Sequence, residues 1–202
     1  MDKQNYFGEI FQSSSTTWLG ATWKWDLYPP LGSIIIIEHD AYLLASCISS
    51  IQTASSEQNR TAQPLQKTAD ELARDYPHLE SLLQTTITGT PLGYIHNKKY
   101  LPQLSPYIPR IHAFMRSATS EECQKILQTN NPFGLLASFH TPTCIDTLIL
   151  AILQRYWEQQ TPKEIEIEQV LQCFTRIAGQ DYLRIHQFVS AMETLLPQGN
   201  HV

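Results

Sequence analysis

The sequence lacks the features that mark a membrane or secreted protein. It contains no run of about 18 apolar residues, so no transmembrane helix is expected. The N-terminus, Met1 to Asn5, is polar and leads into a strand-like segment without an apolar signal region. These absences predict a cytoplasmic protein that does not insert into a membrane.

Cysteine is scarce and widely spaced. The four cysteines, Cys47, Cys123, Cys144 and Cys173, form no Cys-x-x-Cys pair. Disulfide frameworks and zinc sites depend on close or regular cysteine spacing. We therefore expect buried, reduced thiols, no metal site and no cofactor.

Clustered positive charge is also missing. The formal net charge is −5, and the most basic stretch, Lys98-Lys99, is only two residues long. Proteins that bind nucleic acid usually carry a basic patch or stripe, so nucleic acid is not an expected partner. The composition, 42% hydrophobic and 16% charged, is typical of a folded globular protein.

The most informative feature that the sequence does contain is a run of four isoleucines, Ile34 to Ile37. Successive side chains of a strand point to opposite faces, so this strand must be buried on both sides. His39-Asp40 follows as a tight turn, and Ala41 to Ile48 reads as the return strand. The pattern predicts the central hairpin of a small, closed β structure.

Further short strands surround this hairpin. Gly8 and Gly20 fall inside two of them, where glycine often marks a bend at a barrel corner. The strands are expected at Tyr6–Gln12, Trp18–Trp25, Thr85–Gly89 and Leu92–Ile95. Trp18, Trp23 and Trp25 are interpreted as core residues, with an aromatic binding patch as the alternative.

Two other segments interrupt the β pattern. A helical insertion is predicted at about 66–84, where Thr68 and Glu71 have capping-box spacing and Glu80–Leu83 forms another turn. A proline-rich exit strap follows at 101–116. We place a domain boundary near Ser117, which gives a β domain at 1–117 and a helical domain at 118–202.

The second half predicts an α-helical bundle. A short helix is expected at Ser120–Leu127, and longer helices begin at Thr141-Pro142, at Thr161-Pro162 and at about Asp181. Apolar residues recur with helical spacing, and Gly179 is expected to end the third helix. The fold class is therefore α+β: a small antiparallel β-barrel followed by a helical bundle.

The first half resembles a known family. Gly8-Glu9-Ile10 with Ser13–Thr17, and Pro30-Leu31-Gly32-Ser33 before a β-rich run ending in Glu38, are similar to the HAS-barrel. That domain is the N-terminal barrel of HerA-type DNA-translocating ATPases and, more distantly, of ATP synthase subunits. The proline-rich segment from Leu101 to His112 is similar to its exit. The resemblance covers roughly residues 5 to 116.

The chain departs from that family in its chemistry. HerA proteins continue into an ATPase core whose phosphate-binding loop contains Gly-Lys, and this sequence has no Gly-Lys dipeptide. ATPase activity is therefore not implied. What the resemblance implies is subunit association and docking of a partner.

The leading hypothesis is a non-catalytic adaptor or assembly factor that docks on a multi-subunit complex, such as a ring ATPase. The strap presents the predicted partner-binding residues, which are Tyr107, Ile108, Arg110, His112, Phe114 and Arg116. Self-association into a homo-oligomer is a further expectation from the resemblance.

Two alternatives belong to other classes. An accessory role in DNA processing follows from the HerA resemblance alone. The last two helices could form a helix-turn-helix, but their polar face offers only Arg176, Arg184, His186 and Gln187, so a bundle hairpin is expected instead. A cysteine-dependent hydrolase would use His140 and Cys144, but no third orienting group is evident, so the protein is not expected to be an enzyme.

Overall fold

The computed structural model describes residues 5–56, 65–78, 82–129, 131–160 and 162–196. The strands are β1 (Tyr6–Ser13), β2 (Trp18–Thr22), β3 (Ile34–His39), β4 (Tyr42–Ser55), β5 (Leu83–His96), β6 (Lys99–Leu101) and β7 (Phe114–Ser117). The helices are α1 (Ala69–Asp75), α2 (Ser120–Leu127), α3 (Gly134–Ala137), α4 (Ile145–Trp157), α5 (Glu164–Ala178) and α6 (Tyr182–Glu193).

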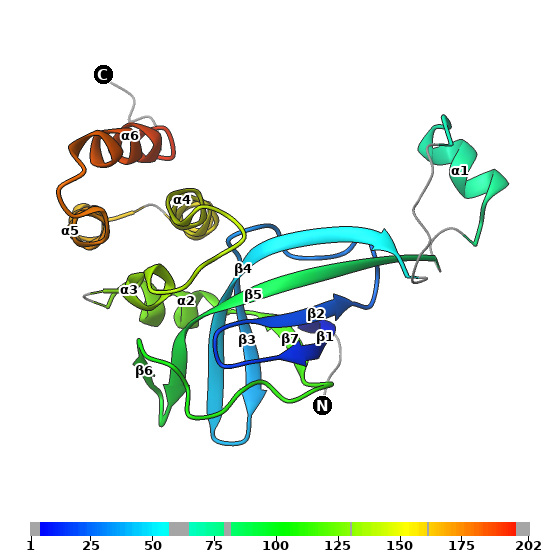
Figure 1. Ribbon diagram of the computed structural model, residues 1–202, viewed down its shortest axis with the longest axis horizontal. Helices are drawn as coiled ribbons and strands as arrows, with labels where there is room; N and C mark the ends of the chain where they lie inside the picture. Colours follow the sequence, from blue (N-terminus) through cyan, green and yellow to red (C-terminus); the bar gives the residue numbers. More distant parts are fainter. Residues whose placement is uncertain (1–4, 57–64, 79–81, 130, 161, 197–202) are drawn as a thin grey trace.

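Six of the strands close into a barrel. Their order is β2-β1-β7-β3-β4-β5, and an additional pairing of β2 with β5 completes the ring. All of these pairings are antiparallel, and β6 extends the sheet from β5 outside the ring. The predicted fold class, an antiparallel β-barrel followed by helices, is confirmed (Figure 1).

The isoleucine run is buried on both faces, as predicted. Ile35 and Ile37 point into the barrel, where they pack with Ile10, Trp18 and Met115. Ile34 and Ile36 point outward into a second core that the helices complete. The strand is apolar throughout because neither of its faces meets water.

The hairpin after this run also forms as predicted. His39 pairs with Tyr42, and Asp40 adopts a φ of +50° in the turn between them. Aspartate tolerates this left-handed conformation better than most residues, because its side chain can hydrogen-bond to the local backbone.

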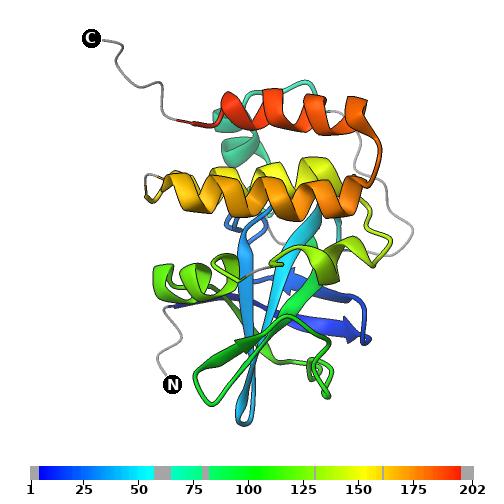
Figure 2. The ribbon, with the colours of Figure 1, turned by 90° about the vertical axis from the view of Figure 1, so that its left-hand side faces the viewer.

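The helices lie over one outer face of the barrel. Their buried residues share a core with the outward side chains of β3, β4 and β5, and the helical contribution includes Leu136, Leu148, Ile152, Phe174 and Phe188. Figure 2 shows α4, α5 and α6 stacked beside the barrel, with α6 farthest from it. The helical half therefore covers the barrel directly.

Several predicted strand boundaries are wrong. Thr85–Gly89 and Leu92–Ile95 belong to one strand, β5, because a register shift between Ala45 and Ser46 on β4 accommodates Pro91. The strand at Trp18 ends at Thr22 rather than Trp25. β6 and β7 were not predicted, since three or four residues after a turn or a proline-rich segment carry little periodicity.

The helical insertion is confirmed over α1. Thr68 accepts the backbone N–H of Glu71, and the Glu71 carboxylate accepts the backbone N–H of Thr68, which is the predicted capping box. Figure 1 shows α1 beyond the far end of the long β4–β5 ribbon. Glu80 and Ser81 of the second expected turn lie outside the described residues, and Leu83 begins β5.

Helix starts were placed too early in two cases. α4 begins at Ile145 behind Cys144, because the Thr141 hydroxyl donates to the Thr143 carbonyl in the preceding turn instead of capping the helix. α5 begins at Glu164, and Thr161 lies outside the described residues. Ser120–Leu127 and the stop at Gly179 are confirmed, while α3 was missed.

Candidate partner-binding site

Residues 102–113 are the part of the predicted exit strap that lies between β6 and β7, and the name strap is kept for this loop from here on. The strap is tied to the barrel by backbone and side-chain hydrogen bonds. The backbone N–H of His112 donates to the Ile10 carbonyl at 2.7 Å, and the N–H of Ile10 donates to the Ala113 carbonyl at 2.9 Å. The Ser13 hydroxyl donates to the Pro109 carbonyl at 2.7 Å. The strap is therefore held against β1 along its second half.

Aromatic rings hold the strap to the tip of the β3–β4 hairpin. Tyr107 stacks on His39 with ring centroids 4.9 Å apart and an interplanar angle of 14°. Tyr107 also meets Tyr42 edge to face at 5.2 Å, and Tyr42 stacks on His96 at 4.4 Å. Arg110 pairs with Asp40 at 2.7 Å on the same hairpin. These contacts order a segment that has no regular secondary structure.

His39 forms the base of this arrangement. Its side chain is only 9% exposed, and its Nδ1 lies 3.6 Å from Oδ2 of Asp40. Among the described residues, Nδ1 has no hydrogen-bond partner. A shallow hollow of about 530 Å³ opens beside it, lined by Ser13, His39 and strap residues Pro106 to Ile111.

The outer side of the strap is apolar and open to solvent. Leu104 is 40% exposed, Tyr107 and Ile108 are each 49% exposed, and Ile111 is 51% exposed. Four large apolar side chains are thus exposed within eight residues of chain, and gathered exposed apolar side chains mark interaction sites in soluble proteins. The hydrogen bonds described above hold its backbone in one conformation.

The six predicted partner-binding residues divide into two groups. Tyr107, Ile108 and Arg110 lie together around the hollow. His112 lies on the strap beside Glu9, with 3.1 Å between Nδ1 and Oε2. Phe114 and Arg116 belong to β7; Phe114 packs between the rings of Tyr6 and Trp23, at 5.5 and 5.4 Å.

Arg116 is occupied by partners within the chain. Its guanidinium binds both carboxylate oxygens of Glu122 at 2.8 Å and lies 3.4 Å from Glu38. The hydrogen bonds to Glu122 raise the pKa of Arg116. Burial alone would raise the pKa of Glu122, but the hydrogen bonds from Arg116 and from the Thr119 backbone together lower it. This ion pair joins β7 to α2.

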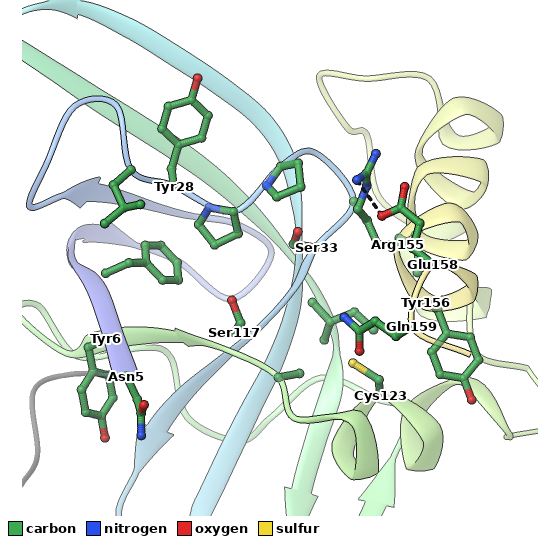
Figure 3. A pocket seen from close by; sticks show the side chains of 18 residues that line it. Asn5, Tyr6, Tyr28, Ser33, Ser117, Cys123, Arg155, Tyr156, Glu158 and Gln159 are labelled. Carbon is green, nitrogen blue, oxygen red and sulfur yellow. Dashed lines mark hydrogen bonds and ion pairs between the residues drawn. The ribbon is translucent and has the colours of Figure 1, made fainter. Parts of the chain in front are cut away.

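A second hollow lies between the barrel and the helices (Figure 3). It has a volume of about 540 Å³ and is lined mainly by β1, the β2–β3 loop, α2 and α4. Arg155 and Glu158 pair at 2.8 Å at its rim. Burial raises the pKa of Cys123 in this cleft to about 11, so its thiol stays protonated at neutral pH.

The residues of the hydrolase hypothesis lie on the segment that enters α4. Cys144 is exposed and precedes the first residue of the helix, and His140 is exposed four residues earlier. No hydrogen bond between the two side chains is found in the described part of the chain. The same part of the chain contains no group of three His, Cys, Asp or Glu side chains that could hold a metal ion.

The last two helices pack as a hairpin through stacked rings. Phe174 and Phe188 lie 3.6 Å apart with an interplanar angle of 9°. Arg184, a candidate phosphate ligand, donates from Nε to Asp146 at 2.8 Å, and the hydrogen bond raises its pKa. One of the few cations on this face is thus already paired with a carboxylate.

Of the three tryptophans near the N-terminus, only Trp18 is in the barrel core. Its indole N–H donates to the Ser46 hydroxyl at 2.9 Å, whereas Trp23 is 44% exposed. Tyr182, expected in the apolar stripe of α6, is 80% exposed. The sequence predicts Trp23 and Tyr182 as core residues, and both predictions are wrong. Trp23 directly follows β2 and Tyr182 is the first residue of α6, so the apolar periodicity of these elements no longer applies to them.

Sequence reasoning missed the contribution of the hairpin tip. His39 was interpreted only as a turn residue, and Tyr42 and His96 were not singled out. The contacts of His39 and Tyr42 with Tyr107 join positions about 65 residues apart in the chain, which local patterns do not report. Leu104 and Ile111 could have been found from the strap sequence, since Leu104 lies between Pro102 and Pro106 and Ile111 follows Pro109 by two residues.

Comparison of the chain with protein-family models and with curated proteins finds no match. Within the described residues, no helix has the length and hydropathy needed to cross a membrane.

Proposed function

We propose that this protein is a non-catalytic adaptor that docks a protein partner on its strap. The observation that carries the proposal is an exposed apolar segment, Leu104 to Ile111, held in one conformation by the barrel. A preorganised segment loses little conformational entropy on binding, so its apolar contacts contribute more fully to affinity.

The resemblance of the first half to the HAS-barrel supports a multi-subunit partner, such as a ring ATPase. In that family the barrel serves association, and the nucleotide site lies in a separate core. This chain has a barrel followed by helices, and its sequence lacks the Gly-Lys of a phosphate-binding loop. Docking is therefore the part of the family's role that its residues can perform.

The test is affinity capture of the tagged full-length protein from its native cell, with mass spectrometry of the captured proteins. In the test variant, Ile108→Glu and Ile111→Glu are combined, because both side chains are about half exposed and the fold should tolerate them. The matched control is Ile165→Glu on α5, an isoleucine that is 61% exposed far from the strap in sequence.

We expect the strap variant to capture at least about tenfold less partner than the native protein. Burying a charge opposite an apolar surface costs more than about 1.4 kcal/mol, which corresponds to a tenfold change in affinity. The control should capture as much partner as the native protein. Equal losses in both variants, or capture of nothing but the chain itself, would contradict the proposal. Capture of DNA-repair proteins with a retarded band in a low-salt gel shift would favour the DNA-processing alternative instead.

A further inference from the structure

The β4–β5 ribbon carries an edge that the barrel does not cover. β3 pairs with β4 only as far as Cys47, whereas β5 pairs with β4 to Ser55. Gly32 and Ser33 continue the backbone hydrogen bonding to Ile48, and the Thr143 hydroxyl donates to the Ser49 carbonyl. From Ile51 to Ala54, no strand among the described residues lies on the other side of β4. Gln52, Thr53 and Ala54 in this stretch are exposed.

The direction of the free backbone groups follows from the ladder. The N–H of Ser56 donates to the Leu82 carbonyl at 2.8 Å, so the backbone groups of Ser56 point toward β5. Successive residues of a strand alternate in this direction. Gln52 and Ala54 therefore also point toward β5, and Ile51 and Thr53 point away from it. Their two N–H and two C=O groups have no hydrogen-bond partner among the described residues.

β4 has a register shift between Ile48 and Ser50, but its edge beyond this shift carries neither charge nor proline. Exposed edge strands in natural proteins are blunted by lysine, other charges or proline. β4 contains no charged residue, proline or glycine over its 14 residues, and β5 contains no Asp, Glu, Lys or Arg. In a chain with a net charge of −5, two copies can meet here without placing like charges opposite each other.

We propose that β4 pairs with β4 of a second copy of this chain, antiparallel about a twofold axis at Gln52. In this register Ile51 lies opposite Thr53 of the second copy, and Thr53 lies opposite its Ile51. The outward groups of the two residues then form four hydrogen bonds, and none remains free. Gln52 faces its own equivalent across a non-hydrogen-bonded position.

The register is self-complementary, as a twofold contact requires. Each Ile51–Thr53 pair places two β-branched side chains side by side, a favourable combination on one face of an antiparallel sheet. An interface of this length is small, so the dimer should be weak and depend on concentration. The edge lies at the opposite end of β4 from the Tyr42 contact with the strap, so both surfaces can be used together.

The first test is sedimentation velocity of the full chain over a range of concentrations, with Thr53→Pro and Thr53→Val as a matched pair. Both variants lose the hydroxyl contact with Thr85. Only proline also removes the outward N–H, and it leaves the β4–β5 bonds in place. Native protein and Thr53→Val should associate. Thr53→Pro should remain monomeric at concentrations at least about tenfold above the one at which the native protein associates.

The second test reads the register by disulfide formation. With the exposed Cys144 replaced by serine, Gln52→Cys should form an intermolecular disulfide, because facing non-hydrogen-bonded Cα atoms are about 4.5 Å apart. Ala54→Cys is the control on the same face of the same strand. Its equivalent lies about 13 Å away in this register, too far for a disulfide.

Association that Thr53→Pro removes, with a crosslink at position 52 and none at 54, supports the proposal. A monomer at every concentration would overturn it, as would association that Thr53→Pro leaves unchanged, or a crosslink at 54 rather than 52. Binding of a different extended polypeptide to the edge of a monomeric chain would overturn it as well. None of these outcomes depends on strap variants, so the adaptor proposal stands or fails separately.

Discussion

At the scale of single residues, Glu122 has the most consequential contacts. Its carboxylate accepts the backbone N–H of Thr119 at 2.8 Å and thereby caps α2, and the same group binds Arg116 of β7. The side chains of Arg116 and Glu122 are 16% and 13% exposed. One side chain therefore begins the first helix after the barrel and holds it to the last barrel strand.

Glu122→Gln should lower the free energy of unfolding by about 1.5–3 kcal/mol at neutral pH, the range for hydrogen bonds to charged groups. Glutamine retains an oxygen that can cap Thr119 but leaves the Arg116 charge with only the longer 3.4 Å contact to the Glu38 carboxylate. Urea unfolding measures the loss. Glu121→Gln is the control, because Glu121 forms only an exposed pair with Lys125 and should matter little.

The stabilisation that Glu122 provides should depend on pH. Because the pKa of Glu122 is lowered in the folded protein, the unfolded chain binds its proton first as the pH falls. The stabilisation is therefore complete above the ordinary glutamate pKa and is lost as the pH falls through the lower, folded value. The difference between native protein and Glu122→Gln should shrink over that window; a constant difference would contradict the ion-pair assignment.

At the scale of elements, β3 separates two cores. Ile35 and Ile37 face the barrel interior, and Ile34 and Ile36 face the helices. An amphipathic strand would tolerate shortening of the side chains on its solvent-facing side. In β3, however, Ile35 and Ile36 point to opposite faces and both are fully buried.

Ile35→Ala and Ile36→Ala should each lower the free energy of unfolding by about 2–5 kcal/mol, the cost of emptying a buried isoleucine site. Ile165→Ala, at an isoleucine that is 61% exposed, should cost much less. Chemical denaturation of the three variants makes the comparison. A small effect for Ile36→Ala would mean that the helices do not cover β3 in solution.

At the scale of the whole molecule, the barrel and the helices depend on the same core. Ile36, Leu92 and Ile95 of the barrel belong to the same buried apolar cluster as Leu148 and Ile152 of α4. Removing the helices would expose this apolar face to water.

We therefore expect the barrel and the helices to unfold in one cooperative transition. Far-UV circular dichroism reports chiefly on the helices, and fluorescence of the buried Trp18 reports on the barrel once Trp157 of α4 is replaced by phenylalanine. The two denaturation curves should coincide, and Ile36→Ala should shift both equally. Separate midpoints would show that the two halves are independent domains.

Much of the fold was predictable because its signals are local. The isoleucine run, the Asp40 turn, the Thr68 capping box and the stop at Gly179 each depend on residues close in sequence. The candidate site was predictable only in part. Tyr107, Ile108 and Arg110 were found from the strap composition, but His39 and Tyr42 join them through contacts between distant segments.

The sequence by itself determined that a doubly buried strand, a tight hairpin and a set of amphipathic helices would exist, because hydrophobic period, turn chemistry and helix caps act over a few residues. The tertiary structure alone decided which isoleucines face the barrel and which face the helices. It also decided that Phe114–Ser117 pairs with both β1 and β3, that Arg116 binds Glu122, and that β4 runs on beyond its pairing with β3. These features depend on strand register and closure, which arise from pairing between segments far apart in the chain.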